Sequence, residues 1–241
     1  MENQNKTYSY PYVFGTRVLV SEESYELNEF TWKNNQVIHD LSIIEPWLKY
    51  IKPGDTVLDI GAQSGMFTLS AKLYPETTWY AFEPDPDNFN CLKQNLELNS
   101  ITNVITSQEA LSDSVGSKTL NIYCSHRGVN TLGENYLPFR ENDNMIHLEV
   151  KTNTIDNLFS DKSVDLIKID TEGAEYDILI GGIETIKRCK PNILLEYSAD
   201  KLGQFGHTVA EFEDLLCNIN YEVAWIAQGS GDIFIQSKEN A

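Results

Sequence analysis

Carboxylates lie in or just after two short β-rich runs, next to glycines, in the first half of the sequence. The run Thr56–Ile60 contains Asp59 and is followed by Gly61 and Gly65, and then by residues that favour a helix. A second run ends in Glu83, 22 residues after Gly61. A strand, a glycine loop and a helix in this order form the first half of a nucleotide-binding α/β unit, in which a carboxylate after the second strand binds ribose hydroxyls. The pattern therefore predicts a site for a ribose-containing ligand.

The loop between these two runs indicates which ligand to expect. Dinucleotide sites carry the pattern G-x-G-x-x-G, whereas this loop reads D-x-G-x-x-x-G. The additional carboxylate, Asp59, would repel a pyrophosphate. It suits a cationic or amine-bearing ligand, and S-adenosylmethionine has a ribose, a sulfonium and an amino group but no phosphate. We therefore expect S-adenosylmethionine, with a nicotinamide dinucleotide as the alternative.

A second group of acidic residues lies near the ends of two later apolar runs. The run Val164–Asp170 is followed by Glu172, and a later run ends near Glu196. Lys168 and Asp170 are two residues apart, so in a strand their side chains point to the same face. Ionisable groups at such positions are costly unless they are paired or functional, and ligands bind at the carboxyl ends of parallel strands. Asp170 and Glu172 are therefore candidate catalytic residues.

The elements that must position these residues follow from hydrophobic periodicity and from chain breaks. Helical spacing predicts helices over His39–Ile51, Asp87–Leu98, Ala174–Arg188 and Val209–Cys217. Alternating residues over Tyr221–Ile226 and Asp232–Ile235 predict a closing antiparallel hairpin. The remaining β-rich runs alternate with helices, which predicts a doubly wound α/β domain over residues 53–241. Residues 1–52 form an N-terminal lead-in that ends at a Pro-Gly break.

Two irregular segments are expected to border the ligand. Glu109–Asp113 reads as a turn after the third strand, at the edge where an adenine would lie. Ser125–Asn144 is the longest irregular stretch, and loops of this length are often functional or mobile. His126, Arg127 and Asn130 are its polar candidates, with His126 as a further candidate base.

Composition and charge narrow the classes of partner. The 241-residue chain has a net charge of −18 and a pI of about 4.5, which argues against bulk nucleic acid and against an anionic membrane surface. Its four cysteines have no C-x-x-C spacing, as expected for reduced thiols. No apolar run approaches the roughly 20 residues that span a bilayer, and Met1–Lys6 lacks a signal-peptide pattern. We therefore expect a cytoplasmic protein.

The motifs together resemble the FkbM family of S-adenosylmethionine-dependent methyltransferases. They are a strand ending D-I-G-A-x-x-G, a strand ending F-E-P, the turn A-L-S-D and the segment D-L-I-K-I-D-T-E-G-A-E, within Asp55–Tyr197. Gln63 stands where the family usually has Asn, which is also an amide. The resemblance implies the class I methyltransferase fold, Rossmann-like, with a seven-stranded, mostly parallel sheet, helices on both faces and an antiparallel last strand.

The resemblance also implies roles for individual residues. The residues that would bind the cofactor S-adenosylmethionine are Asp59, Gly61, Gln63, Gly65, Glu83, Ala110, Leu111 and Asp170. Asp170 and Glu172 would face the methyl group and the acceptor. The family's activity implies methylation of a hydroxyl on a sugar or a natural product.

The chemistry of such a transfer leaves several alternatives open. A sugar hydroxyl is barely ionised at neutral pH, so a general base helps, with Asp170 first and Glu172 and His126 behind it. A Mg²⁺ ion could instead lower the hydroxyl pKa, held by Asp170, Glu172 and Glu196. The main hypothesis is an O-methyltransferase that acts on a carbohydrate, glycan or similar polyol. The rivals are a non-sugar acceptor (natural product, peptide or lipid), a nicotinamide-dependent oxidoreductase, a nucleic-acid methyltransferase and a non-catalytic binding module. The sequence leaves the oligomeric state open.

Overall fold

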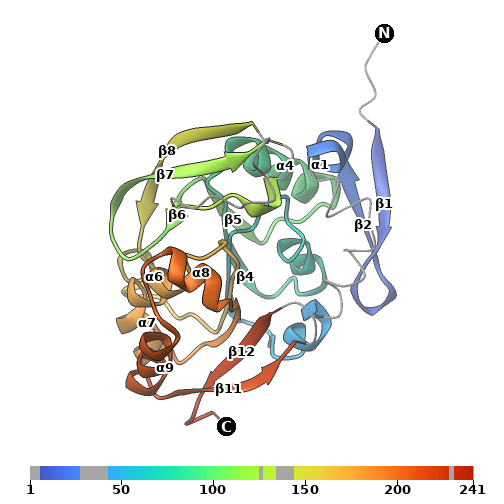
Figure 1. Cartoon of the computed structure of the whole chain (residues 1–241). Coiled ribbons are helices and arrows are strands. Elements are labelled where there is room, and N and C mark those ends of the chain that lie inside the picture. The colour runs from blue at the N-terminus through green and yellow to red at the C-terminus, as the bar shows by residue number, and fades with distance from the viewer. Residues whose placement is uncertain (1–5, 28–42, 125–126, 134–143, 228–230, 241) are drawn as a thin grey trace.

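The computed structural model describes residues 6–27, 43–124, 127–133, 144–227 and 231–240, and its centre is a seven-stranded sheet (Figure 1). The strands lie in the order β11-β12-β10-β9-β3-β4-β5. Their bounds, in that order, are Tyr221–Ile226, Asp232–Ser237, Asn192–Glu196, Leu166–Ile169, Thr56–Ile60, Thr78–Phe82 and Val104–Ser107. Strand β12 is antiparallel to both of its neighbours, whereas β10, β9, β3, β4 and β5 run parallel. The predicted sheet with its closing hairpin is confirmed.

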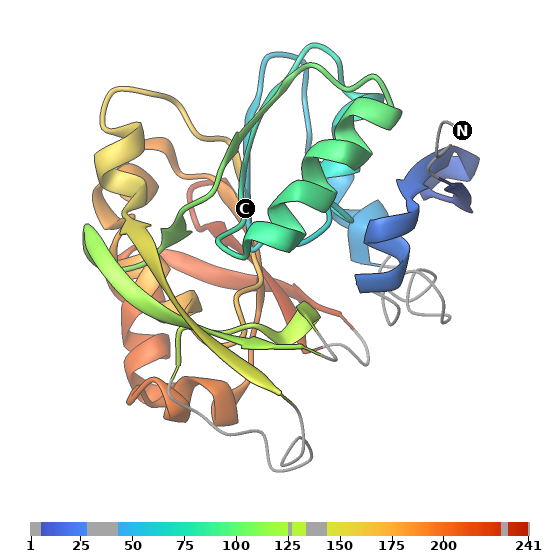
Figure 2. The same ribbon diagram turned by 90° about the horizontal axis from the view of Figure 1, so that it is seen from above.

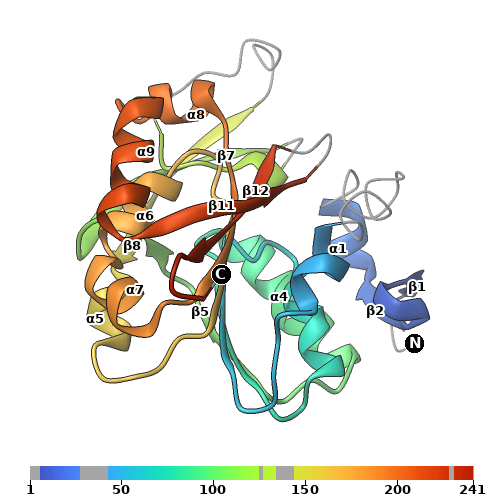
Figure 3. The ribbon, with the colours of Figure 1, turned by 90° about the horizontal axis from the view of Figure 1, so that it is seen from below.

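Both faces of the central strands of this sheet are buried, as expected for a doubly wound α/β fold. In β3, Val57 belongs to the hydrophobic cluster on one face and Leu58 to the cluster on the other. The first face is covered by a helical segment at 43–48, η2 (Thr68–Leu73) and α4 (Pro86–Leu98). The second is covered by α5 (Ile155–Phe159), α6 (Glu175–Ile180), α7 (Ile183–Cys189), α8 (Ala199–Gln204) and α9 (Val209–Asn218). Figures 2 and 3 show the two groups of helices on opposite sides of the sheet.

A smaller sheet is inserted between β5 and β9 in the chain. Its strands lie in the order β6-β8-β7, with bounds Ala110–Leu111, Met145–Asn153 and Gly116–Tyr123. Leu120, Ile122 and Val150 pack with Ala110 into a separate hydrophobic cluster. After β7 the chain forms η3 (Arg127–Val129), which becomes part of the candidate site.

The N-terminal lead-in forms a hairpin that is hydrogen-bonded to α4. It consists of β1 (Thr7–Pro11), η1 (Val13–Gly15), β2 (Arg17–Ser21) and α1 (Glu22–Leu27). Asn95 of α4 accepts from the Ser21 N–H at 2.9 Å and donates to the Ser24 hydroxyl at 2.9 Å. Asn99 accepts from the Leu19 N–H at 3.0 Å and donates to the Leu19 carbonyl at 2.7 Å. These buried amides, together with the apolar side chains of β2, hold the lead-in against the sheet domain.

The helix predicted after the glycine loop is a 3₁₀ helix, η2. Buried polar contacts compete with α-helical bonding there. The Tyr12 hydroxyl donates to the Met66 carbonyl, which in an α-helix would accept from residue 70. The Thr68 hydroxyl points inward and donates to Asp59. The predicted helix is therefore present, but as a 3₁₀ helix over Thr68–Leu73.

Three further segments differ from the sequence prediction. The helix predicted over Ala174–Arg188 is two helices, α6 and α7, because the chain breaks at Gly181, where a Cβ would lie 2.1 Å from the Ser112 carbonyl oxygen. The predicted turn at Glu109–Asp113 contains strand β6, and α8 follows β10 in a segment for which no helix was predicted. Residues 39–42 of the predicted first helix lie outside the described residues. No helix within the described ranges is long and apolar enough to cross a membrane.

Candidate active site

A pocket opens at the carboxyl ends of β3, β4 and β9, next to the smaller sheet. Because these strands are parallel neighbours, the loops that follow them meet at one edge. Glu83 follows β4, Gly61 follows β3 and Asp170 follows β9, so β3 lies between the two carboxylates. The sequence-predicted residues that line the pocket are Gly61, Gln63, Glu83, Ala110, Leu111, Asp170 and Glu172.

Glu83 is buried at the pocket wall, where backbone N–H groups bind both of its oxygens. Oε2 accepts from the N–H of Gln63 at 2.7 Å, and Oε1 accepts from the N–H of Asp85 at 2.9 Å. Burial raises the pKa of the Glu83 carboxyl to about 8, although the two N–H groups oppose this shift. Each oxygen has a further lone pair, so Glu83 can still accept hydrogen bonds from a ligand.

The raised pKa of Glu83 predicts a pH dependence of stability with a defined sign. Its folded-state pKa of about 8 lies above the ordinary value of 4.5, so folding takes up a proton and the unfolding free energy falls as pH rises between these values. The stabilising contribution is complete below the ordinary pKa, and it is lost at about 1.4 kcal/mol per pH unit as the pH rises through that window. We expect Glu83→Gln to remove this slope, so the stability advantage of the wild type over the variant shrinks from about pH 6 to about pH 8 in urea unfolding.

The matched control for this comparison is Glu97→Gln, because Glu97 is an exposed acid of α4, the helix that begins shortly after Glu83. Its unfolding free energy should run parallel to that of the wild type at every pH. A difference between wild type and Glu83→Gln that stays constant with pH would contradict the burial effect.

Asp59 lies behind the glycine loop, outside the pocket lining. It is fully buried, and its Oδ2 accepts from the Thr68 hydroxyl at 2.5 Å. The Nζ of Lys168 lies 3.7 Å from Asp59 Oδ1 and 3.3 Å from Asp170 Oδ2, and it donates to the Gly61 carbonyl at 3.3 Å. Burial raises the pKa of Asp59, whereas Lys168 opposes that shift. Burial alone would lower the pKa of Lys168, but Asp170 and Asp59 raise it.

Close contacts shape the glycine loop. Gln63 has a φ of 50°, which turns its N–H toward Glu83. A Cβ on Gly65 would lie 2.8 Å from the Leu92 side chain, so glycine lets α4 pack against the loop, and Gly65 lies outside the pocket lining. A Cβ on Gly128 would lie 2.7 Å from Gln63 Nε2. The Gln63 amide therefore reaches the segment 127–133 on the far wall of the pocket.

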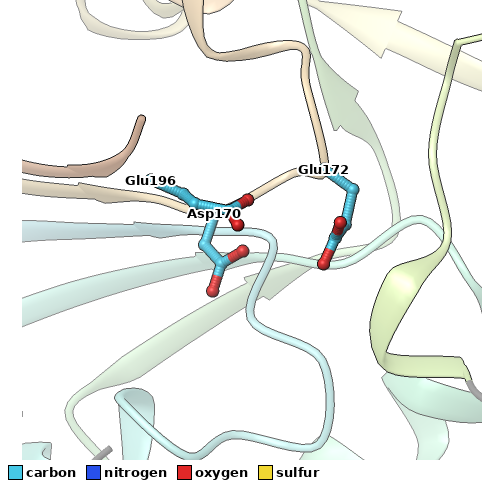
Figure 4. Close-up of side chains that lie close together, drawn as sticks. All are labelled: Asp170, Glu172 and Glu196. Atoms are coloured by element: carbon cyan, nitrogen blue, oxygen red, sulfur yellow. The ribbon is translucent and has the colours of Figure 1, made fainter. Parts of the chain in front are cut away.

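Asp170, Glu172 and Glu196 form a compact carboxylate cluster on the other side of β3 (Figure 4). One oxygen from each lies within 4.8 Å of the others. Asp170 and Glu172 line the pocket, whereas Glu196 does not. The Nζ of Lys201, from α8, lies 2.5 Å from Glu172 Oε2 and also pairs with Glu196 Oε1. Burial is the main cause that raises the pKa of both glutamates, and Lys201 opposes it.

The loop that carries Glu172 is held by Glu175, the first residue of α6. Oε1 of Glu175 accepts from the Thr171 N–H at 2.8 Å, from the Thr171 hydroxyl at 2.9 Å and from the Gly173 N–H at 3.3 Å. Glu172 itself has a φ of 60°. This left-handed conformation is costly for a non-glycine residue, and the three hydrogen bonds to Glu175 fix the turn around it.

The wall formed by 127–133 is fastened to the start of α4 by Asp85. Arg127 Nη1 donates to both carboxylate oxygens of Asp85, at 2.9 and 2.8 Å, and Asn130 Nδ2 donates to Oδ2 at 2.7 Å. Asp85 is fully buried, and it also caps α4. Arg127 and Asn130 line the pocket, as the sequence suggested for this loop. His126, the third polar candidate, lies outside the described residues.

Asp85 and Lys201 are site residues that the sequence interpretation missed. A local signal for Asp85 exists, because an Asp before a Pro that opens a helix is a typical N-cap. Its partner Arg127 is 42 residues away, and nothing local indicates that pairing. Lys201 lies in a segment for which no helix was predicted, and only the fold brings it to the carboxylates.

Comparisons with known proteins show which family the chain and its fold resemble. The family model described as "Methyltransferase FkbM domain" matches residues 59–223. Methyltransferase 1 of Beauveria bassiana is 31% identical over 172 residues, which cover 64% of this chain and 69% of that protein. The 2-O-methyltransferase NoeI of Sinorhizobium fredii is 25% identical over 202 residues, covering 77% and 81%. A solved structure of methyltransferase FkbM from Methylobacillus flagellatus matches with a TM-score of 0.51 at 14% identity, over 88% of this chain and 60% of that one.

The fold is that of a class I, S-adenosylmethionine-dependent methyltransferase. The family model covers well over half of the chain, and the solved structure supports the same fold. The chain belongs to the FkbM methyltransferase family. The family predicted from the sequence is therefore confirmed, whereas the roles of individual site residues stay predictions.

Proposed function

We propose that the protein transfers the methyl group of S-adenosylmethionine to a hydroxyl of a carbohydrate, glycan or similar polyol. The observation that carries this proposal is one pocket lined by Glu83 on one side of β3 and by Asp170 and Glu172 on the other. Glu83 can accept hydrogen bonds from ribose hydroxyls on one side of the glycine loop. The carboxylates on the other side can bind a second molecule that carries hydroxyls. The name of the relative NoeI, a 2-O-methyltransferase, supports oxygen as the methylated atom.

The pocket has groups that fit the adenosine part of the cofactor. Glu83 would accept from the ribose hydroxyls, and the apolar residues Ala110 and Leu111 would contact the adenine. Two buried atoms of lining residues, Asn88 Oδ1 and Arg127 Nε, have no hydrogen-bond partner among the described residues. Buried polar atoms are usually paired, so a polar ligand edge would complete this wall.

The glycine loop would hold the methionine part of the cofactor. Gly61 and Gln63 line the pocket directly. Asp59 would act through Lys168, which binds the Gly61 carbonyl from behind. Gly65 would contribute by letting the loop pack against α4.

The chain's own part in the reaction would be alignment and proton removal. The bound cofactor supplies an electrophilic methyl group, which the acceptor oxygen takes as the carbon–sulfur bond breaks and its electron pair goes to sulfur. The enzyme has to hold the acceptor in line with that bond. Asp170 would take the hydroxyl proton, because it lines the pocket and its side chain is 41% exposed. Glu172 is the second candidate and His126 the third.

Several wider features belong to the same proposal. Residues 1–52 would act as a cap on a methyltransferase domain over 53–241. The net charge of −18 argues against a bulk nucleic-acid substrate, and we propose a small-molecule or glycan acceptor in the cytoplasm. Two alternatives remain. The acceptor is a natural product, peptide or lipid, or the protein binds the cofactor without turnover, and the acceptor test below distinguishes both from the main proposal.

The first test is calorimetric titration of S-adenosylhomocysteine into wild type and Glu83→Ala. We expect the substitution to weaken binding by about 1–3 kcal/mol, because it leaves the ribose hydroxyls without a buried acceptor. Glu97 is an exposed acid on α4, so the control variant Glu97→Ala should bind S-adenosylhomocysteine as tightly as the wild type does. Absence of binding to the wild type would remove the methyltransferase proposal.

The acceptor class requires a second measurement. Methyl transfer from isotope-labelled S-adenosylmethionine would be followed on neutral sugars and oligosaccharides, and in parallel on polyketides, peptides and lipids with free hydroxyls. Turnover on the sugars supports the polyol proposal, and turnover confined to another class replaces it. Cofactor binding without turnover on any acceptor would favour the non-catalytic module.

A further inference from the structure

We propose that Lys201 is the resident cation of the carboxylate cluster and a positioning residue for Glu172, so that this cluster works without a divalent metal ion. The cluster consists of Asp170, Glu172 and Glu196, the residues whose types and positions suggested Mg²⁺. The catalytic part of this inference rests on the proposed function. The other part, that Lys201 neutralises the carboxylates in place of a metal ion, does not depend on the proposed function.

The carboxylates already have cationic partners. Lys201 Nζ pairs with one oxygen of Glu172 and one of Glu196. The third carboxylate, Asp170, has Lys168 Nζ at 3.3 Å. A hard divalent ion would need oxygens from the same carboxylates, and an ammonium between two of them would repel it. The position that a metal ion would take between Glu172 and Glu196 is therefore held by a lysine.

Packing fixes Lys201 in this position. Helix α8 starts three residues after the end of β10, which carries Glu196, and Ser198 caps it through the Lys201 N–H at 3.4 Å. Phe205, directly after α8, lies so close to Gly173 that a Cβ there would approach its ring to 2.5 Å and the Lys201 carbonyl oxygen to 3.3 Å. The helix that carries Lys201 and the turn that carries Glu172 thus pack as one unit.

The orientation of Glu172 follows from this unit. Glu172 lines the pocket, and its Oε2 is bound to Lys201, whereas Lys168 pairs with Asp170. Without the ammonium of Lys201, Glu172 and Glu196 would lose the cation that favours their ionised forms, and two ionised carboxylates at this distance would repel each other. Lys201 therefore sets both the direction of the Glu172 carboxylate and the net charge at the acceptor side of the pocket.

The first test is calorimetric titration of Mn²⁺ into wild type, Lys201→Met and the control Lys187→Met, an exposed lysine of α7. We expect Lys201→Met to bind Mn²⁺ at least about tenfold more tightly than wild type or control, because removing one positive charge unmasks the oxygens. Adding Glu172→Gln should abolish the gain. No gain in Lys201→Met, or Mn²⁺ binding to the wild type that Asp170→Asn removes, would overturn the proposal.

A stability cycle keeps the test decisive if Lys201→Met folds poorly. Lys201→Met should lower the urea midpoint, and adding Glu196→Gln should restore it, because the second change removes a buried carboxyl group that has lost its cationic partner. A double variant no more stable than Lys201→Met would contradict the resident-cation role.

Kinetics separate positioning from a purely structural role. Once the acceptor is identified, Lys201→Met should lower kcat at least about tenfold. Its affinity for S-adenosylhomocysteine should stay within about twofold of the wild type. Lys201→Arg keeps the positive charge and should retain more activity than Lys201→Met. Equal losses in both quantities would indicate a structural role only. If the wild type turns over no acceptor, the proposed function fails, and the Mn²⁺ and stability results still judge Lys201.

Discussion

Asp170→Asn is expected to lower kcat by roughly 10²–10⁴-fold, the usual contribution of a general base, while the affinity for S-adenosylhomocysteine changes little. Asn is nearly isosteric with Asp and keeps a hydrogen-bond acceptor, so the acceptor hydroxyl can still bind. It cannot take the proton at neutral pH. The position suits this role, because Asp170 lines the pocket at the end of β9 and its side chain is partly exposed.

The comparison variants for Asp170→Asn are Glu172→Gln and Asp161→Asn. Asp161 is an exposed acid before β9 and should leave kcat unchanged. A larger loss of kcat in Glu172→Gln than in Asp170→Asn would move the role of base to Glu172. Wild-type kcat in Asp170→Asn would exclude Asp170 as the base. Labelled methyl transfer under saturating cofactor measures all three variants.

The parts of the fold that the sequence predicts well are those with local signals. The β-rich runs around Asp59, Glu83 and Asp170 each end at a break, and their order along the chain matches a parallel sheet. The closing hairpin is marked by alternation and a glycine-rich turn. What failed depends on distant contacts. The division of the predicted 174–188 helix at Gly181, for example, reflects the approach of the Ser112 carbonyl, which belongs to the segment that follows β6 of the smaller sheet.

The residues of the candidate site also differ in how well the sequence predicts them. The positions of Glu83, Asp170 and Glu172 after β-rich runs were enough to predict that they lie close together, and all three line the pocket. Asp59 was expected to contact the ligand, but the register of β3 against β9 pairs it with Lys168, and a register between strands 109 residues apart has no local signature. Lys201 was missed because it lies on α8, whereas its partner Glu172 lies in the loop after β9, and no local pattern connects the two. Charge pairing across a fold is set by tertiary packing, which residue types and spacing do not encode.

Gly61→Ala is expected to destabilise the protein by roughly 3–5 kcal/mol, which combines backbone strain with a steric clash. Gly61 has a φ of 78°, and a Cβ at this position would lie 1.9 Å from the carbonyl oxygen of Asp170. That oxygen belongs to the backbone, so no side-chain rotation relieves the clash. The chain after β3 or the chain after β9 would have to move.

Gly54→Ala separates the two terms of this prediction. Gly54 has a φ of 90°, but nothing lies within 4 Å of the position that a Cβ would take there, so the change introduces strain without a clash. Its cost should stay near the roughly 1–3 kcal/mol of strain alone, measured by urea unfolding with linear extrapolation. Equal losses in the two variants would mean that the contact between Gly61 and Asp170 contributes nothing. A larger loss in Gly61→Ala, with reduced kcat in the fraction that folds, would tie the closeness of β3 and β9 to the placement of the proposed base. The reason is that the backbone that Gly61 approaches is that of Asp170 itself.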